Sequence, residues 1–281
     1  MYPHPCFDEQ AHAHVGRVHL PVAPRCNIQC AFCERRICVN LTEQHPGWAQ
    51  RILSPGEAAA LVDRLVRDED SRCIEKDEAQ YPFVVGVAGP GEPWENDETF
   101  VTLYLVHQAH PTLRKCVSTN GLLLEARLPQ LLDVGVTSLT VTVNAPDSDT
   151  GQHLYLWARD DGTVYRGLEA AEHLIECQRR GIQAALEAGL RLKVNTVLVP
   201  GVNDQHVARL AQQLEQMGVR LMNLMPLIPS GAMRARRPPT CEELRQARLV
   251  CEAWVPQFRA CEQCSADVIR FPHRAVAQFT G

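Results

Sequence analysis

Short apolar runs separated by amphipathic stretches form the main pattern of the chain. Six runs are rich in β-branched residues and end at turn residues: VHLPVA (18–23), FVVGVAG (83–89), LRKCVSTN (113–120), SLTVTVN (138–144), LKVNTVLV (192–199) and VRLMNLMPL (219–227). Helical periodicity lies between them, as in SPGEAAALVDRLVRD, which Ser54 caps and Pro55 opens, and in VARLAQQLEQMG, which Gly218 closes. This alternation predicts parallel strands joined by crossover helices.

The number of strand–helix units sets the fold. Six units in about 210 residues are fewer than the eight of a complete barrel, so we predict an α/β fold with a partial (β/α)6 TIM-like barrel. Chemistry in such folds gathers at the carboxyl ends of the strands. The segments found there are CNIQCAFC (26–33), GPGEP (89–93), STNG (118–121), Asn144, Asn195 and Met225–Leu227. We expect one domain over residues 1–281, with extensions at 1–16 and 241–281.

Composition narrows the partners of this fold. The net charge of -5 leaves no basic stripe for phosphates, which argues against nucleic acid and favours a small substrate. The chain has no apolar run of about 18 residues and no signal-peptide pattern in its first segment, so we expect a cytoplasmic protein without membrane contact.

The 12 cysteines indicate metal chemistry rather than disulfides, because the cytosol keeps thiols reduced. Cys26, Cys30 and Cys33 offer three thiolates on one short loop. Structural zinc requires four protein ligands, whereas a [4Fe-4S] cluster on three thiolates keeps one iron open for another ligand.

The C-x3-C-x2-C spacing, with Phe32 before the last cysteine, resembles the signature of the radical S-adenosylmethionine (SAM) enzymes. The resemblance implies a [4Fe-4S] cluster on Cys26, Cys30 and Cys33. Its open iron would bind the amino and carboxylate groups of SAM, and an electron from the cluster would generate a 5′-deoxyadenosyl radical. A zinc site or a purely structural site is the plainer alternative.

The segments at the strand ends resemble the SAM pocket of that family. The GPGEP segment implies that Gly89, Gly91 and Glu92 hold the amino group of SAM. By the same resemblance, Ser118, Asn144 and Asn195 would face the ribose and carboxylate, and the stretch from Met225 through Leu227 to Ile228 would line the adenine. Taken singly, each segment is equally typical of a βα loop or a helix cap.

Strand alternation makes His19 a candidate ligand. Val18, Leu20 and Val22 share one face, so His19 should point into the barrel, on the side of the cysteines. A buried histidine bonded to a carbonyl is the structural alternative.

Several segments in order along the chain resemble the radical SAM maturases of the nitrogenase cofactor: HPC, GRVHLPVAP, CNIQCAFC, GVAGPGEP, CVSTNGL, KVNTVLVPGVND, NLMPLI and CEQCSAD. That resemblance implies two further [4Fe-4S] clusters, K1 and K2, as substrates. One would bind Cys6, Cys116 and a histidine, for which His19 is our choice and His4, His12 and His14 are the alternatives. The other would bind Cys38, Cys261 and Cys264.

The resemblance also implies a reaction and its partners. The two clusters would be fused around a carbide derived from SAM into an eight-iron precursor, with Cys38 and Glu43 at the catalytic centre. Glu43 matches the family pattern only if Leu41-Thr42 is an insertion. An electron donor of the ferredoxin or flavodoxin type and Fe-S cluster donors would serve a monomer. Because the chain ends soon after CEQC, we expect a separate cofactor carrier protein to accept the product.

Two other functions compete with this interpretation. One is a radical SAM enzyme of another branch with auxiliary clusters, similar to the molybdopterin-precursor cyclase. The other is a non-catalytic Fe-S carrier, which needs cysteines but no SAM pocket. The remaining cysteines are expected to bind no metal: Cys177 and Cys251 fit helix cores, and Cys73 and Cys241 have no companions.

Overall fold

The centre of the molecule is a seven-stranded sheet with the order β11-β10-β7-β6-β5-β1-β12. The computed structural model describes residues 3–41, 43–70 and 83–272. Six of these strands are parallel to their neighbours: β1 (Gly16–His19), β5 (Phe83–Val87), β6 (Lys115–Thr119), β7 (Val136–Thr142), β10 (Arg191–Leu198) and β11 (Met222–Pro226). The short β12 (Ile269–Arg270) pairs antiparallel with β1. The six predicted strands are confirmed, with bounds that differ by a few residues.

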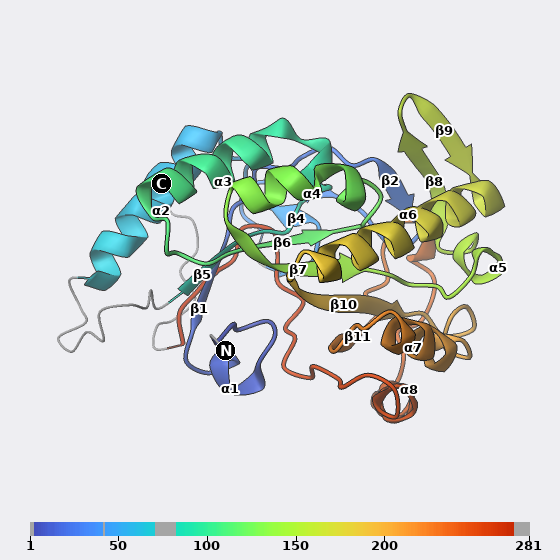
Figure 1. Ribbon diagram of the computed structural model, residues 1–281. Helices are drawn as coiled ribbons and strands as arrows, with labels where there is room; N and C mark the ends of the chain where they lie inside the picture. Colours follow the sequence, from blue (N-terminus) through green and yellow to red (C-terminus); the bar gives the residue numbers. More distant parts are fainter. Residues whose placement is uncertain (1–2, 42, 71–82, 273–281) are drawn as a thin grey trace.

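Helices cover the outer face of this sheet. The longer ones are α2 (Pro55–Asp70), α3 (Asp97–Ala109), α4 (Leu124–Asp133), α6 (Gly167–Glu187), α7 (Val207–Gln216) and α8 (Cys241–Glu252). Figure 1 shows α2, α3, α4 and α6 in a row above the strands, and α7 and α8 near β11. Single turns are α1 (Glu9–His12), α5 (Ser148–Gly151) and the 3-10 turns Pro93–Glu95 and Gly231–Met233. No helix in the described ranges has the length and apolarity to span a bilayer.

The two helices read from the sequence begin and end as predicted. The Ser54 amide donates to the Glu57 carboxylate at 2.8 Å, and the Glu57 amide donates back to the Ser54 hydroxyl at 3.3 Å, which closes a capping box around α2. Beyond α7, Gly218 takes a φ of +92°, a conformation that favours glycine after a helix.

The first strand separates the core from the barrel interior. Val18, Leu20 and Val22 are fully buried in the core beneath the helices, so His19 lies on the opposite face, as strand alternation predicts. Regular pairing ends at His19 rather than at Ala23. Pro21 and Pro24 explain this, because neither has an N–H for a ladder.

A small sheet beside the barrel was not predicted. It consists of β2 (Ile28–Cys30), β8 (Tyr155–Asp160) and β9 (Thr163–Arg166), all antiparallel. A further pair joins β3 (Arg36–Ile37) to β4 (Trp48–Ala49). The β8–β9 turn consists of Asp161 and Gly162, with φ of 43° and 75°. An Asp-Gly pair between polar-apolar alternations is a strong local signal for a hairpin.

Candidate active site

The cysteine triplet surrounds β2 of the small sheet, with Cys30 at the end of the strand and Cys26 and Cys33 on either side of it. Ala31 donates to the carbonyl of Leu154 at 2.8 Å, and the Gln29 side chain donates to the carbonyls of Cys30 and Cys33 at 3.0 and 2.9 Å. Burial raises the pKa of the Cys26 thiol to about 12, and it raises the pKa values of Cys30 and Cys33 as well. Thiols in such a setting stay protonated unless a metal takes the sulfur.

The spacing of these three sulfurs decides between a single ion and a cluster. In the described part of the chain, one set of three His, Cys, Asp or Glu ligand atoms lies within 4.8 Å of one another, and it is not the triplet. Sulfurs around one tetrahedral zinc would be about 3.8 Å apart, given Zn–S bonds of about 2.3 Å. As the side chains lie, at least one pair of triplet sulfurs is more than 4.8 Å apart, and this wider spacing fits a [4Fe-4S] cluster, which binds each thiolate on a separate iron.

A pocket opens beside the triplet at the carboxyl ends of the parallel strands. The space inside it amounts to about 1040 Å³, a figure that includes open solvent at the mouth. All three cysteines line it, together with five of the predicted SAM contacts: Gly91, Glu92, Ser118, Asn144 and Met225. Gly89, Asn195 and Leu227 are not among its lining residues, and Ile228 is.

Gly91 brings the GPGEP loop against the cysteine loop. Its amide donates to the carbonyl of Ala23 at 2.6 Å, and a Cβ at this position would lie 2.1 Å from the carbonyl oxygen of Arg25. Glycine alone fits so close an approach between two backbones.

Glu92 is a buried carboxylate that ties two strand ends together. It accepts hydrogen bonds from the Thr119 hydroxyl at 2.6 Å, the Asn120 amide at 2.7 Å and the Trp94 amide at 3.3 Å. Burial outweighs these bonds and raises the pKa of Glu92 to about 7. Its predicted role as a SAM contact stays a prediction, as do the other SAM contacts.

Asn144 and Asn195 differ in what they leave unpaired. The Asn144 side-chain oxygen accepts from the Val197 amide at 2.8 Å, while its Nδ2 is buried without a partner. An unpaired donor that borders the pocket fits a ligand with oxygen atoms, such as the carboxylate or ribose of SAM. The Asn195 oxygen instead accepts from Asn223 at 3.1 Å.

A second group of predicted ligands lies deeper in the barrel, and we call it the barrel floor: Cys6, His19, Cys116, Cys261 and Cys264. His19, Gly86 and Cys116 occupy adjacent positions across β1, β5 and β6. A Cβ on Gly86 would lie 2.9 Å from Cys116 Sγ and 3.4 Å from His19 Cδ2. The glycine therefore leaves space between the two side chains.

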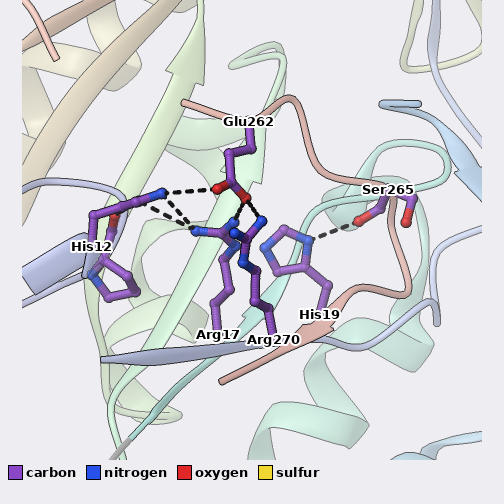
Figure 2. A network of polar contacts seen from close by, with 7 residues as sticks. His12, Arg17, His19, Glu262, Ser265 and Arg270 are labelled. Carbon is purple, nitrogen blue, oxygen red and sulfur yellow. Dashed lines mark hydrogen bonds and ion pairs between the residues drawn. The ribbon is translucent and has the colours of Figure 1, made fainter. Parts of the chain in front are cut away.

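His19 has one ring nitrogen available. Its Nδ1 lies 3.0 Å from the carbonyl of Ser265, and Figure 2 shows this bond. Because a carbonyl only accepts, Nδ1 carries the proton and Nε2 is the free acceptor. His4, an alternative, also has a buried Nε2 without a partner, whereas His14 is exposed and His12 is bound to the Pro5 carbonyl at 2.7 Å.

The cysteines of the floor lie near one another. Burial raises the pKa values of Cys6, Cys116 and Cys264. The Cys6 charge adds to the shift at Cys116 and Cys264, and the Cys261 charge adds to the shift at Cys6 and Cys264. The structure therefore brings together thiols that are up to 258 positions apart in the sequence.

A carboxylate fixes the CEQC loop over this floor. Glu262 pairs with Arg17 on β1 and Arg270 on β12, and its other oxygen lies 3.5 Å from His12 Nε2 (Figure 2). The next residue, Gln263, donates to the carbonyl of Pro226 at 3.0 Å and lines the pocket. Nothing in the sequence pattern indicated Arg17, Glu262 or Gln263, although Glu262 and Gln263 lie between two predicted ligands.

Cys38 and Glu43 differ from the floor ligands in their exposure. Both are exposed, and Cys38 Sγ donates to the carbonyl of its neighbour Val39 at 3.3 Å. Within the described ranges, no hydrogen bond joins Cys38 to Cys261 or Cys264. The predicted set of Cys38, Cys261 and Cys264 and the role of Glu43 stay predictions.

The other cysteines have structural surroundings. Cys251 is fully buried in the core, Cys241 is exposed, and Cys73 lies outside the described residues. Cys177 belongs to the close set noted above, with His173 and Asp160. All three already have partners, since His173 bonds Asp160 at 2.8 Å and stacks on Tyr165, and Arg180 donates to Cys177 Sγ at 3.4 Å. This set ties the β8–β9 hairpin to α6.

Comparisons with known proteins agree with this site. Residues 77–214 match the radical SAM superfamily. The NifB FeMo cofactor biosynthesis protein of Methanocaldococcus jannaschii is 44% identical over 266 residues, which cover 95% of this chain and 85% of that protein. The corresponding protein of Methanocaldococcus infernus is 42% identical, with 95% and 84% covered. The NifB protein of Klebsiella pneumoniae is 38% identical, and the match spans 56% of its length.

The fold also matches a solved structure. A radical SAM methyltransferase from Sphaerobacter thermophilus aligns with a TM-score of 0.52 at 21% identity, over 87% of this chain and 64% of that one. At this identity the likeness concerns the fold alone, and it confirms the partial-barrel prediction.

Proposed function

The chain belongs to the NifB family of FeMo cofactor biosynthesis proteins within the radical SAM enzymes, and from this we propose that it fuses two [4Fe-4S] clusters around a SAM-derived carbide. The product would be the eight-iron precursor of the nitrogenase cofactor. The observation that carries the proposal is the supply of ligands at two levels of one barrel. A triplet borders a pocket that five of the predicted SAM contacts line, and further thiols lie on the floor beneath it.

The residues at the pocket would bind and orient SAM. Cys26, Cys30 and Cys33 would hold the resident cluster, which when bound supplies the electron that cleaves SAM. The proposed SAM contacts keep their predicted roles, with Asn144 as the buried donor that has a free N–H. The remaining contacts are Gly89, Gly91, Glu92, Ser118, Asn195, Met225 and Leu227.

The floor would bind the substrate clusters. We assign Cys6, Cys116 and His19 to one cluster and Cys38, Cys261 and Cys264 to the other, and Glu43 to the catalytic centre with Cys38. Three ligands for each cluster suit a substrate, because an incompletely tethered cluster can be rearranged and released. The carbon would come from a SAM methyl group, and a second SAM would supply the radical that removes hydrogen from it. The barrel walls would exclude water from that radical.

The proposal also covers organisation and partners. Residues 1–281 would act as one cytoplasmic monomer whose two extensions carry cluster ligands. Cluster donors, a ferredoxin-type or flavodoxin-type electron donor and a separate carrier protein would serve it.

The test is iron content together with SAM cleavage in protein reconstituted without oxygen. We expect about twelve irons per monomer, as three [4Fe-4S] clusters, and 5′-deoxyadenosine after reduction. About four irons with normal SAM cleavage would assign the chain to a different radical SAM reaction. Iron without any SAM cleavage would make it a carrier.

A variant of Cys38 tests the grouping. Cys38→Ala should leave SAM binding intact and stop cluster fusion, because one substrate cluster loses a ligand. Cys241→Ala, another exposed cysteine, is the matched control. Unchanged fusion in Cys38→Ala would remove Cys38 from the proposal.

A further inference from the structure

The barrel floor contains a buried ammonium that no carboxylate balances. Lys193 lies on β10 and is 3% exposed. Its Nζ donates to the carbonyl of Cys6 at 2.7 Å and lies 4.9 Å from the ring centroid of Phe258 and 5.2 Å from that of Phe7. Across the described residues, no carboxylate forms an ion pair with it.

These contacts do not offset the free-energy cost of burying a charge. The desolvation penalty of an ion exceeds what one neutral hydrogen bond and two aromatic faces return, so buried charges are normally paired. Arg17 makes the contrast within the same floor, because Glu262 pairs with it (Figure 2). Lys193 therefore lacks the anion that Arg17 has.

The anion that fits this position is defined by the neighbours of Lys193. Its ammonium bonds the backbone carbonyl of Cys6, and its charge also favours the thiolate forms of Cys6 and Cys116. Thiolates bound to an iron–sulfur cluster carry negative charge, and one more electron adds to that charge. A bound cluster thus supplies the counter-charge that the protein itself does not.

We propose that Lys193 is the charge-compensating residue of the iron–sulfur cluster held at Cys6 and Cys116, and that it governs the retention and reduction potential of that cluster. The inference rests on the proposed function, since it takes the floor as a cluster site. It assigns to Lys193 an electrostatic role, separate from the roles of the ligands and of SAM.

The test compares Lys193→Gln with Lys193→Arg and Lys115→Gln. Glutamine keeps a donor for the Cys6 carbonyl but removes the charge, whereas arginine keeps the charge. Lys115 is the matched control, because it is fully buried in the same sheet and donates to the carbonyl of Leu113 at 2.7 Å. Its side chain lies on the helix side of the sheet, because a Cβ on Gly135 would be 3.4 Å from Lys115 Cε and 2.8 Å from His107 on α3.

We expect the effect of Lys193→Gln to depend on whether the floor holds an iron–sulfur cluster. In reconstituted protein, a chelator should remove the floor iron about ten to a hundred times more readily. This is the usual loss of metal affinity when a residue that supports the ligands is removed. The reduction potential of the floor cluster, followed by electron paramagnetic resonance, should become more negative, since a cation favours the reduced state. SAM cleavage at the triplet should be unchanged, and Lys193→Arg and Lys115→Gln should keep the wild-type potential.

The metal-free chain should respond in the opposite direction. Removing an unpaired buried charge should leave its resistance to urea equal or higher. A Lys193→Gln chain that fails to fold without metal would overturn the inference, because the protein itself would then require the charge. An unchanged potential and unchanged retention in loaded Lys193→Gln would overturn it as well. Wild-type protein with only four irons would instead refute the proposed function on which it rests.

Discussion

The mouth and the floor of the barrel are built from the same sheet but in different ways. Residues at the mouth come in contiguous segments, such as Cys26–Cys33 and GPGEP, whose backbones touch at Gly91. Residues on the floor come from distant segments, with Cys6, Cys116 and Cys264 as examples, and the Glu262–Arg17 salt bridge holds the loop that carries Cys264. The mouth is thus a local construction, and the floor depends on the tertiary fold.

This difference predicts that the two levels can be damaged separately. A change at the mouth should abolish SAM chemistry and spare the floor iron, whereas a change on the floor should do the reverse. Each prediction below tests that separation.

The largest effect is expected for Cys30→Ser at the mouth. With two thiolates left, the resident cluster should be lost and SAM cleavage should fall to background, while about eight irons stay on the floor. Iron analysis and 5′-deoxyadenosine formation measure the two effects. Cys251→Ser, which alters a core cysteine outside both levels, is the control for cysteine loss. Loss of all iron in Cys30→Ser would show that the levels are not independent.

Gly91→Ala should be next in magnitude. Its Cβ would overlap the carbonyl of Arg25, so the GPGEP loop must move and the free energy of unfolding should fall by about 3 kcal/mol or more. The Kd for SAM should rise while the floor keeps its iron. Gly56→Ala is the matched control, because a Cβ at Gly56 meets nothing within 4 Å. Equal SAM affinity in the two variants would contradict the close approach at Gly91.

The fold could be predicted because its signals are periodic. Each of the six parallel strands is an apolar run between turn residues, and the Ser54 and Gly218 helix ends follow local rules. The β8–β9 hairpin had an equally local signal in Asp161–Gly162. It does not resemble the buried strands of the barrel, because its two strands are partly polar and partly exposed.

The site was predictable only where residues are contiguous or chemically rare. Cysteines on the floor were candidates because sulfur is distinctive, and His19 followed from strand alternation. Arg17, Lys193 and Glu262 were missed because charged residues are common and nothing local indicates burial. Only the fold places Arg17 and Lys193 in the interior, at 4% and 3% exposure, and pairs the first of them with Glu262.

Glu92 gives a pH-dependent prediction for the mouth. Its pKa is raised from 4.5 to about 7 in the folded chain, so between these values the native state holds a proton that the unfolded state has lost. Stability should therefore decrease as pH rises through this window, by about 3 kcal/mol for this group. Urea unfolding of wild type and Glu92→Gln from pH 4.5 to 8 measures this pH dependence of the free energy of unfolding.

The difference between the two pH profiles is the quantity to compare. Buried His19, whose pKa is lowered to about 4, contributes the opposite slope and is common to both proteins. The profile of Glu92→Gln should rise relative to wild type as pH increases, and parallel profiles would show that Glu92 is ionised in the folded state at low pH.

The smallest effect is expected for Glu262→Gln on the floor. Arg17 would keep a polar neighbour but lose its counter-charge, and because Glu262 is 30% exposed we expect a loss of about 2 kcal/mol, less than for a fully buried pair. Glu252→Gln breaks an exposed pair with Arg259 and should cost under about 1 kcal/mol. If the CEQC loop is held as the structure shows, Glu262→Gln should also release floor iron while SAM cleavage at the mouth persists. Since Glu262 contacts neither the triplet nor the pocket, a parallel loss of SAM cleavage would mean that the CEQC loop, through Gln263, joins the two levels into one unit.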